Sequence, residues 1–253
     1  MSKNLFLLYH LGLGDQIICN GLVRYLYKQY ETLTIPAFRH NISTIEKMFS
    51  DLDNLLVLPV LNDHEASLIA EHVARKKFLP PWKVCDIFAL GGFNPENGLD
   101  HTGKLGEVET FDEVFYVQAE VNYLERWKSF YVPPNEQSQK LVLDKLQICD
   151  YNNYIFVHDD ASRDLNIKSE KLPKLPIVRP DHELGKLSDI AIFDYLEVLK
   201  MASEIHCIDS SFAAYIDHVP ELKAKKKVIH RYVRKENDNP RYLNNWIIDE
   251  DIY

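Results

Sequence analysis

Short apolar runs alternate with stretches of helical periodicity along the first half of the chain. Nearly continuous apolar runs of this length are typical of buried parallel strands, and they occur at 5–9, 33–38, 55–60 and 83–90. Apolar residues that share one helical face predict helices between these runs, at 16–30, about 43–49 and 63–77. Strands that alternate with helices predict a doubly wound α/β sheet.

The same alternation restarts in the second half. Strands are predicted at 154–158, 175–180, 204–208 and 225–233, the last of the series. Helices are predicted at 137–148 and 190–202, and a turn leading into a helix at 209–219. The Pro-containing segment 132–136 links the halves, which predicts one lobe at 1–135 and a second at 136–253. The tail 239–253 is expected to pack back across the first lobe.

One region breaks the alternation. Residues 91–109 are rich in glycine and polar residues, which predicts a long loop. Long loops in compact domains are often functional. An aromatic segment at 111–130 follows and predicts a helix.

Composition narrows the class of protein. The 253 residues carry a net charge of −9, so no overall basic field attracts nucleic acid, although a local site can still bind a phosphorylated small molecule. The four cysteines show no Cys-x-x-Cys spacing, which disfavours zinc and fits reduced thiols. The start of the chain does not resemble a signal peptide, and no apolar run approaches the ~20 residues that span a bilayer. We therefore expect a cytoplasmic protein without a transmembrane segment.

The stretch HLGLGDQII, which begins at His10, joins the first strand to the first helix. Gly12 and Gly14 occupy the first two positions of a dinucleotide-binding GxGxxG turn, but Ile17 stands at the third. A carboxylate at a helix start repels phosphate, so Asp15 disfavours a diphosphate site here. Two interpretations stay open for Asp15: a helix N-cap, or a base that takes a proton from a hydroxyl group at the carboxyl edge of the sheet.

Three residues follow the second strand at the same predicted edge. Arg39, His40 and Asn41 are candidates for contacts with a ligand bound at this edge, and His40 is the next candidate for the base. An ordinary helix start explains the His-Asn pair equally well.

The strand and helix at 204–218 suit an anion instead. Asp209, Ser210 and Ser211 fall at the helix start, where hydroxyl and backbone N–H groups can bind phosphate. A simple serine cap is the alternative interpretation.

The polar turn after the strand 154–158 supplies further candidates. Arg163 and Lys168 are cations that can meet a diphosphate, and His158 ends the strand. Solvated loop charges and a hydrogen-bonded core histidine are the alternatives for these residues.

The stretch HLGLGDQIICNGLVRYL resembles the first strand, turn and helix of GT-B glycosyltransferases of the heptosyltransferase type, glycosyltransferase family 9. The resemblance implies two Rossmann-like lobes facing a central cleft, with Asp15 on the acceptor side as the base. On that side, Gly12 and Gly14 are expected to let the acceptor come close, and Arg39 and Asn41 to contact it. EIHCIDSSFAAYIDH resembles the donor-binding segment of the second lobe, although Ser211 stands where that family commonly has glycine, and the histidine comes later, at 218. The Ser-Ser pair also resembles the strand–SerSer–helix segment of the α1,6-fucosyltransferase group. That group has a pair of arginines shortly after a histidine, and this pair is absent after His158.

These features together predict an inverting, metal-independent glycosyltransferase without a resident cofactor. Its partners would be a nucleotide-diphosphate sugar and a glycan or glycoconjugate acceptor. No Asp-x-Asp stretch lies in a convincing metal-binding context, neither DLD at 51–53 nor DED at 249–251. The chain is short for this architecture. We therefore expect the acceptor lobe to depend on a partner chain, for example a second copy of this chain in a homo-oligomer. A noncatalytic nucleotide- or sugar-binding relative and another nucleotide-sugar enzyme, such as an epimerase, remain the alternatives.

Overall fold

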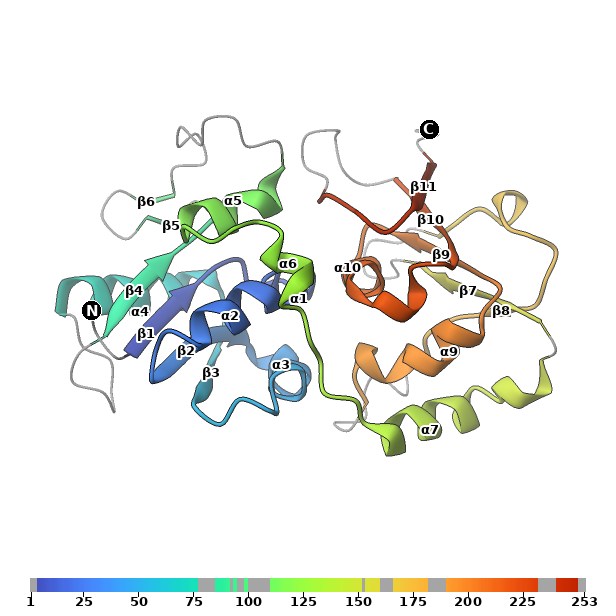
Figure 1. Cartoon of the computed structure of the whole chain (residues 1–253), viewed down its shortest axis with the longest axis horizontal. Coiled ribbons are helices and arrows are strands. Elements are labelled where there is room, and N and C mark those ends of the chain that lie inside the picture. Colours follow the sequence, from blue (N-terminus) through green and yellow to red (C-terminus); the bar gives the residue numbers. More distant parts are fainter. Residues whose placement is uncertain are drawn as a thin grey trace. The chain divides into compact units, whose positions relative to one another are not determined.

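The protein divides into two compact units, each with its own parallel sheet (Figure 1). The computed structural model describes residues 4–76, 85–91, 93–94, 98–99, 110–151, 153–159, 166–181, 190–231 and 240–249. Unit 1 is Met1–Pro133 and unit 2 is Pro134–Tyr253. The division falls inside the segment 132–136, where the sequence predicts the link.

The sheet of unit 1 has four strands, all parallel, in the order β3-β2-β1-β4. Its strands are β1 (Asn4–Leu8), β2 (Thr32–Phe38), β3 (Leu55–Val60) and β4 (Asp86–Ala89). Phe6 pairs with Thr34, and Leu8 pairs with Ala89. The carboxyl ends of these neighbouring strands therefore meet at one edge, where α/β folds bind their ligands.

Helices pack on both faces of this sheet (Figure 1). They are α1 (Leu13–Ile18), α2 (Asn20–Tyr27), α3 (Ile42–Met48), α4 (Asp63–Lys76), α5 (Phe111–Gln118) and α6 (Glu125–Lys128), with the 3-10 turn η1 (Arg39–Asn41). On one face, Phe6 and Leu8 are buried against Ala70 and Val73 of α4. Burial on both faces explains why β1 and β2 read as continuous apolar runs.

The helix predicted at 16–30 is two helices that meet at Cys19. The hydroxyl of Tyr116, from α5, donates to Ile18 O at 2.7 Å and accepts from Leu22 N at 3.2 Å. Those two backbone groups would bond to each other in a continuous helix, so the inserted hydroxyl accounts for the break. The first helix also begins at Leu13, earlier than predicted.

The helix predicted at 111–130 is also interrupted. After α5, Glu120 adopts a left-handed conformation with φ 55°, and α6 follows as a short separate helix. The backbone of α6 packs closely on Gly21, where a Cβ atom would lie 2.2 Å from Glu125 O. Of the predicted loop at 91–109, residues 93–94 and 98–99 form the antiparallel pair β5 (Phe93–Asn94) and β6 (Gly98–Leu99). Most of the rest lies outside the described residues.

The sheet of unit 2 has five strands, all parallel, in the order β11-β10-β9-β7-β8. Its strands are β7 (Ile155–His158), β8 (Ile177–Val178), β9 (Glu204–Ile208), β10 (Lys226–His230) and β11 (Trp246–Asp249). Its helices are α7 (Glu136–Lys145), α9 (Leu196–Met201) and α10 (Ser211–His218), with the 3-10 turns η2 (Ile148–Asp150), η4 (Ser169–Lys171), η5 (Ile192–Tyr195) and η6 (Pro220–Leu222). The described helices lack the combination of length and apolar character that crossing a bilayer requires.

The strand predicted as the last, β10, is followed by another. Residues 246–249 of the tail form β11 in unit 2, and the expected packing of the tail on the first lobe stays a prediction. Buried Asp217 of α10 holds this segment, because its Oδ1 accepts from Leu243 N, Asn244 N and Trp246 Nε1 at 3.0–3.1 Å. A buried carboxylate needs such donors, and the sequence does not reveal which segment supplies them.

Candidate active site

The turn after β1 is fixed by side chains that reach the neighbouring strand. Tyr9 is fully buried and donates to Gln16 Oε1 at 2.7 Å, and Gln16 Nε2 donates to Pro36 O of β2 at 3.0 Å. His10 Nε2 lies 2.7 Å from Gly91 O, beyond the end of β4. The start of α1 is therefore held at the carboxyl edge of the sheet.

Asp15 is the third residue of α1 and not its N-cap, so the cap interpretation is wrong. Gly12 holds the cap position, and its carbonyl accepts from Gln16 N at 3.0 Å. A Cβ atom built on Gly12 would lie 2.9 Å from Asp15 Oδ2. The half-buried carboxylate thus lies over the backbone of Gly12, and a side chain there would displace it. Gly14 is the second residue of α1.

Cys19 lies within the electrostatic reach of this carboxylate. Burial raises the pKa of the Cys19 thiol well above its usual range, and the charge of Asp15 raises it further. The thiol therefore stays protonated at neutral pH and is a poor nucleophile. Cys19 therefore does not compete with Asp15 as a proton acceptor at this edge.

The predicted acceptor residues follow β2 at the same edge. Arg39 and His40 are exposed in η1, and the His40 ring stacks on Phe38 with centroids 5.5 Å apart. Asn41 holds the N-cap position of α3 without a side-chain capping bond. Their position fits both interpretations, since exposed polar groups at this edge are available to a ligand and also begin a helix.

In unit 2, the structure brings two predicted residues together. Ser210 is the N-cap of α10, where its Oγ accepts from Ala213 N at 3.4 Å and lies 3.0 Å from His158 Nδ1. The contact exists because His158 is opposite Cys207 in adjacent parallel strands. The His158 ring also packs on Phe212, with centroids 4.5 Å apart. The serine cap interpretation is therefore right, and a capping hydroxyl can still contact an anion.

The remaining predicted donor residues are placed differently. Asp209 is buried and accepts from Tyr242 OH at 2.9 Å, whereas Ser211 is half-buried as the first residue of α10. Lys168 is exposed at the start of η4. Arg163 lies outside the described residues.

Sequence reasoning missed an ion pair at this edge. Asp159, directly after β7, accepts from Ile167 N at 2.7 Å and from Arg179 Nε at 2.6 Å. Arg179 follows β8, so the rule that placed the other candidates at strand ends could have found it. Tyr242 gave no such signal, because it lies in a tail without a recognisable motif.

Within the described part of the chain, no cluster of three or more His, Cys, Asp or Glu residues could hold a metal ion. Two of the described aspartates in the Asp-x-Asp stretches bind cationic side chains. Asp51 forms a two-point ion pair with Arg24, and Asp249 binds Lys171.

Solved structures share this fold. The chain is similar to the crystal structure of a family 9 glycosyltransferase from Veillonella parvula DSM 2008, with a TM-score of 0.58 and 10% identity, over 97% of this chain and 85% of the other. It is also similar to E. coli ADP-heptose LPS heptosyltransferase II, with a TM-score of 0.57 and 9% identity, over 98% and 90% of the two chains. No protein-family model and no curated protein sequence matches the chain. The predicted GT-B-like α/β fold of the heptosyltransferase type is confirmed.

Proposed function

We propose that this protein is a glycosyltransferase that moves a sugar from a nucleotide-diphosphate sugar to a hydroxyl acceptor, with inversion and without a metal ion. The donor binds at the carboxyl edge of the unit 2 sheet, and the acceptor binds at the carboxyl edge of the unit 1 sheet. A glycan or glycoconjugate is the acceptor class.

One observation carries the proposal: the start of α10 offers hydroxyl and N–H donors at a strand edge without a competing carboxylate in the first turn. The dipole of the helix favours an anion at that position. Ser210 and Ser211 add hydroxyl groups, and His158 fixes the orientation of the first. The chain also shares its fold with an ADP-heptose LPS heptosyltransferase, whose name includes a nucleotide-diphosphate sugar.

The reaction is a single displacement. Asp15 takes the proton of the acceptor hydroxyl while its oxygen attacks the anomeric carbon of the donor. The bond from that carbon to the diphosphate oxygen breaks, and its electron pair leaves with the diphosphate. Donors at the start of α10, with Lys168 and Arg163, stabilise the leaving charge.

The test places charge where the anion binds. In the Ser210→Asp/Ser211→Asp variant, a carboxylate still caps the helix, because aspartate caps about as well as serine. We expect normal thermal unfolding but no binding of nucleoside diphosphates in calorimetry. The Asn135→Asp/Gln137→Asp variant adds the same two charges at the start of α7 and should bind normally. Unchanged affinity in the Ser210/Ser211 variant would remove this site.

Turnover separates catalysis from simple binding. A noncatalytic relative would bind the nucleotide sugar and transfer nothing to any acceptor, and it would be unaffected by changes at Asp15. A thermal-shift screen of nucleotide sugars identifies the donor, since a ligand specific for the folded state raises the melting temperature.

A further inference from the structure

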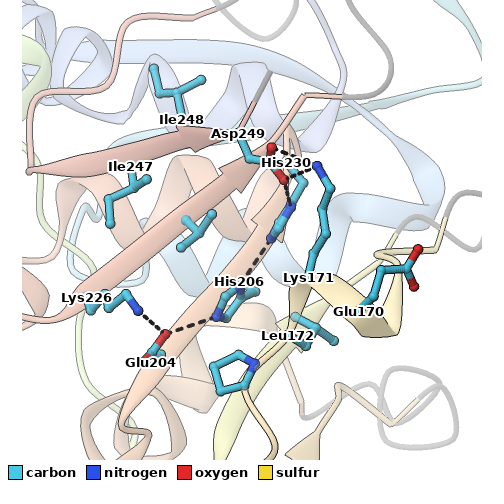
Figure 2. Close-up of a pocket in the computed structure, with 12 residues that line it drawn as sticks. Glu170, Lys171, Leu172, Glu204, His206, Lys226, His230, Ile247, Ile248 and Asp249 are labelled. Atoms are coloured by element: carbon cyan, nitrogen blue, oxygen red, sulfur yellow. Dashed lines mark hydrogen bonds and ion pairs between the residues drawn. The ribbon is translucent and has the colours of Figure 1, made fainter. Parts of the chain in front are cut away.

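A pocket of about 570 Å³ lies on one face of the unit 2 sheet, lined by β9, β10, β11 and η4 (Figure 2). Lys226 pairs with Glu204, and His230 pairs with Asp249 in the strand register. Because side chains alternate between the faces of a sheet, these residues and His206 all point to the same face. The pocket is therefore lined by titratable groups from three neighbouring strands.

Two buried histidines lie at its centre. His206 Nδ1 is 3.1 Å from His230 Nε2, and the rings stack with centroids 5.4 Å apart. His206 Nε2 is 3.4 Å from Glu204 Oε2, and His230 Nδ1 is 2.9 Å from Asp249 Oδ2. The histidines are only 3% and 1% exposed, so all four ring nitrogens depend on partners inside the protein.

A lysine binds each of the two outer carboxylates. Lys226 Nζ lies 2.8 Å from Glu204 Oε2, and Lys171 Nζ donates to both oxygens of Asp249 at 2.8 Å. Lys171 belongs to η4, so Asp249 joins η4 and β11 to β10. Figure 2 shows these contacts as one continuous line across the sheet. We call the six residues the histidine network: Lys226, Glu204, His206, His230, Asp249 and Lys171.

The network can hold a limited number of protons. The imidazole rings make three contacts: one with each other, one with Glu204 and one with Asp249. Each contact has room for one proton, whereas two neutral rings carry only two protons between them. The contact between His206 and Glu204 is the longest of the three, at 3.4 Å. A third proton completes all three contacts. A fourth would set N–H against N–H between the rings and place two buried positive charges 5.4 Å apart.

Other charged groups act on the same rings. Glu170 of η4 also lines the pocket, and Asp159 beyond β7 acts on His230. Burial is the main cause that lowers the pKa of both imidazoles, and His230 lowers the pKa of His206 further. Glu204 and Asp249 act in the opposite direction. The closed network therefore takes up protons less readily than two free histidines do.

We propose that the histidine network is an acid-operated latch, which holds β11 and η4 on the sheet near neutral pH and releases them below about pH 6. When β11 leaves, His230 loses Asp249 and can turn away from His206. Each ring then binds its own proton near the ordinary value of about 6.5. Once both rings of the open state are protonated, it holds at least one proton more than the closed state, so acid then favours opening by about tenfold or more per pH unit.

Hydrogen exchange tests the latch in the full-length protein without any ligand. After correction for the intrinsic exchange rate, protection of the amides at 246–249 should fall about tenfold or more from pH 6 to pH 5. Amides of β7 in the same unit provide the reference and should change less. Protection of β11 that does not depend on pH would overturn the proposal.

A variant isolates the second histidine. In His206→Asn, an amide oxygen can accept from a protonated His230 that still donates to Asp249, so the closed state has no proton conflict. We expect the pH dependence of β11 protection to disappear there, while the matched variant of an exposed histidine, His64→Asn, keeps it. Persistence of the pH dependence in His206→Asn would contradict the latch.

Nitrogen NMR of the unmodified protein tests the proton count without a substitution. The closed form should show at most three protons on the ring nitrogens of His206 and His230 down to pH 5. Two fully protonated rings in the folded protein, with β11 still protected, would also overturn the proposal.

Discussion

The strand ends of units 1 and 2 present the same local unit, a strand that turns into a helix, with opposite electrostatics. In unit 1, Asp15 stands in the first turn of α1 and no side chain caps the helix. In unit 2, the Ser210 hydroxyl caps α10, and its first turn contains no acidic residue. The first turn of α1 already holds a negative charge, whereas Asp209 precedes the N-cap of α10 and is buried against Tyr242, which leaves the first turn of α10 available to an anion.

This difference assigns distinct chemistry to two similar pieces of backbone. A carboxylate near a helix N-terminus stays ionised and can accept a proton, but it repels phosphate. A hydroxyl cap leaves the helix dipole free for a phosphate group. The fold thus provides the edges, and one or two residues at each edge determine what binds there.

The largest expected effect comes from removing the charge in unit 1. Asp15→Asn keeps the shape of the side chain and should lower transfer by roughly 10²–10⁴-fold, the usual contribution of a positioned base. Stability and nucleotide affinity should stay close to normal. Steady-state kinetics and calorimetry measure the two effects separately.

A matched variant controls for the loss of a first-turn carboxylate. Asp63 is exposed in the first turn of α4, and Asp63→Asn should leave transfer unchanged. Near-normal transfer by a folded Asp15→Asn protein would make Asp15 structural and direct the search for the base to His40.

A smaller loss should follow from moving the carboxylate instead of removing it. Gly12→Ala places a Cβ atom 2.9 Å from Asp15 Oδ2, although the backbone φ of −58° suits alanine. Displacement of a reacting group by about 1 Å can cost up to ~10²-fold, so we expect a fall of about 10–100-fold in transfer with the fold intact. Transfer at the normal rate would show that the carboxylate position does not matter.

In unit 2, removing one hydroxyl should have a moderate effect. Ser210→Ala should cost about 1 kcal/mol of stability through the lost cap and lower nucleotide affinity about tenfold through one lost bond to a charged group. Denaturant unfolding and calorimetry measure these changes. Ser203→Ala removes the bond from Ser203 Oγ to Tyr154 O at the other end of β9 and should lower stability only. Equal affinities of the two variants would argue against a phosphate at α10.

The smallest expected effect is that of a chelator. If hydroxyl, N–H and cationic groups stabilise the leaving diphosphate, transfer should keep its rate in excess EDTA. Activity that disappears with EDTA and returns with Mn²⁺ would mean that a metal ion does the work proposed for the start of α10.

Much of the fold could be predicted from local patterns. The predicted strands at 55–60 and 204–208 coincide with β3 and β9, because short runs rich in apolar and β-branched residues favour strands. The predicted helix at 63–77 is α4 over all of its described residues, since one apolar face is enough to define a surface helix. Asp15, Ser210 and Ser211 were placed at strand edges by the same reasoning.

Contacts between distant segments decided the rest. Tyr116 divides a helix that lies 98 residues before it, and Asp217 fixes a tail whose sequence carries no strand signal beyond a short apolar run. His158 meets Ser210 only because β7 and β9 are neighbours in the sheet. The sequence by itself determined where most of the strands run and that Asp15, Ser210 and Ser211 follow strand ends, since apolar runs and turn residues are local signals. Tertiary structure alone decided which of them touch, because hydrogen bonds between buried groups depend on strand order and register.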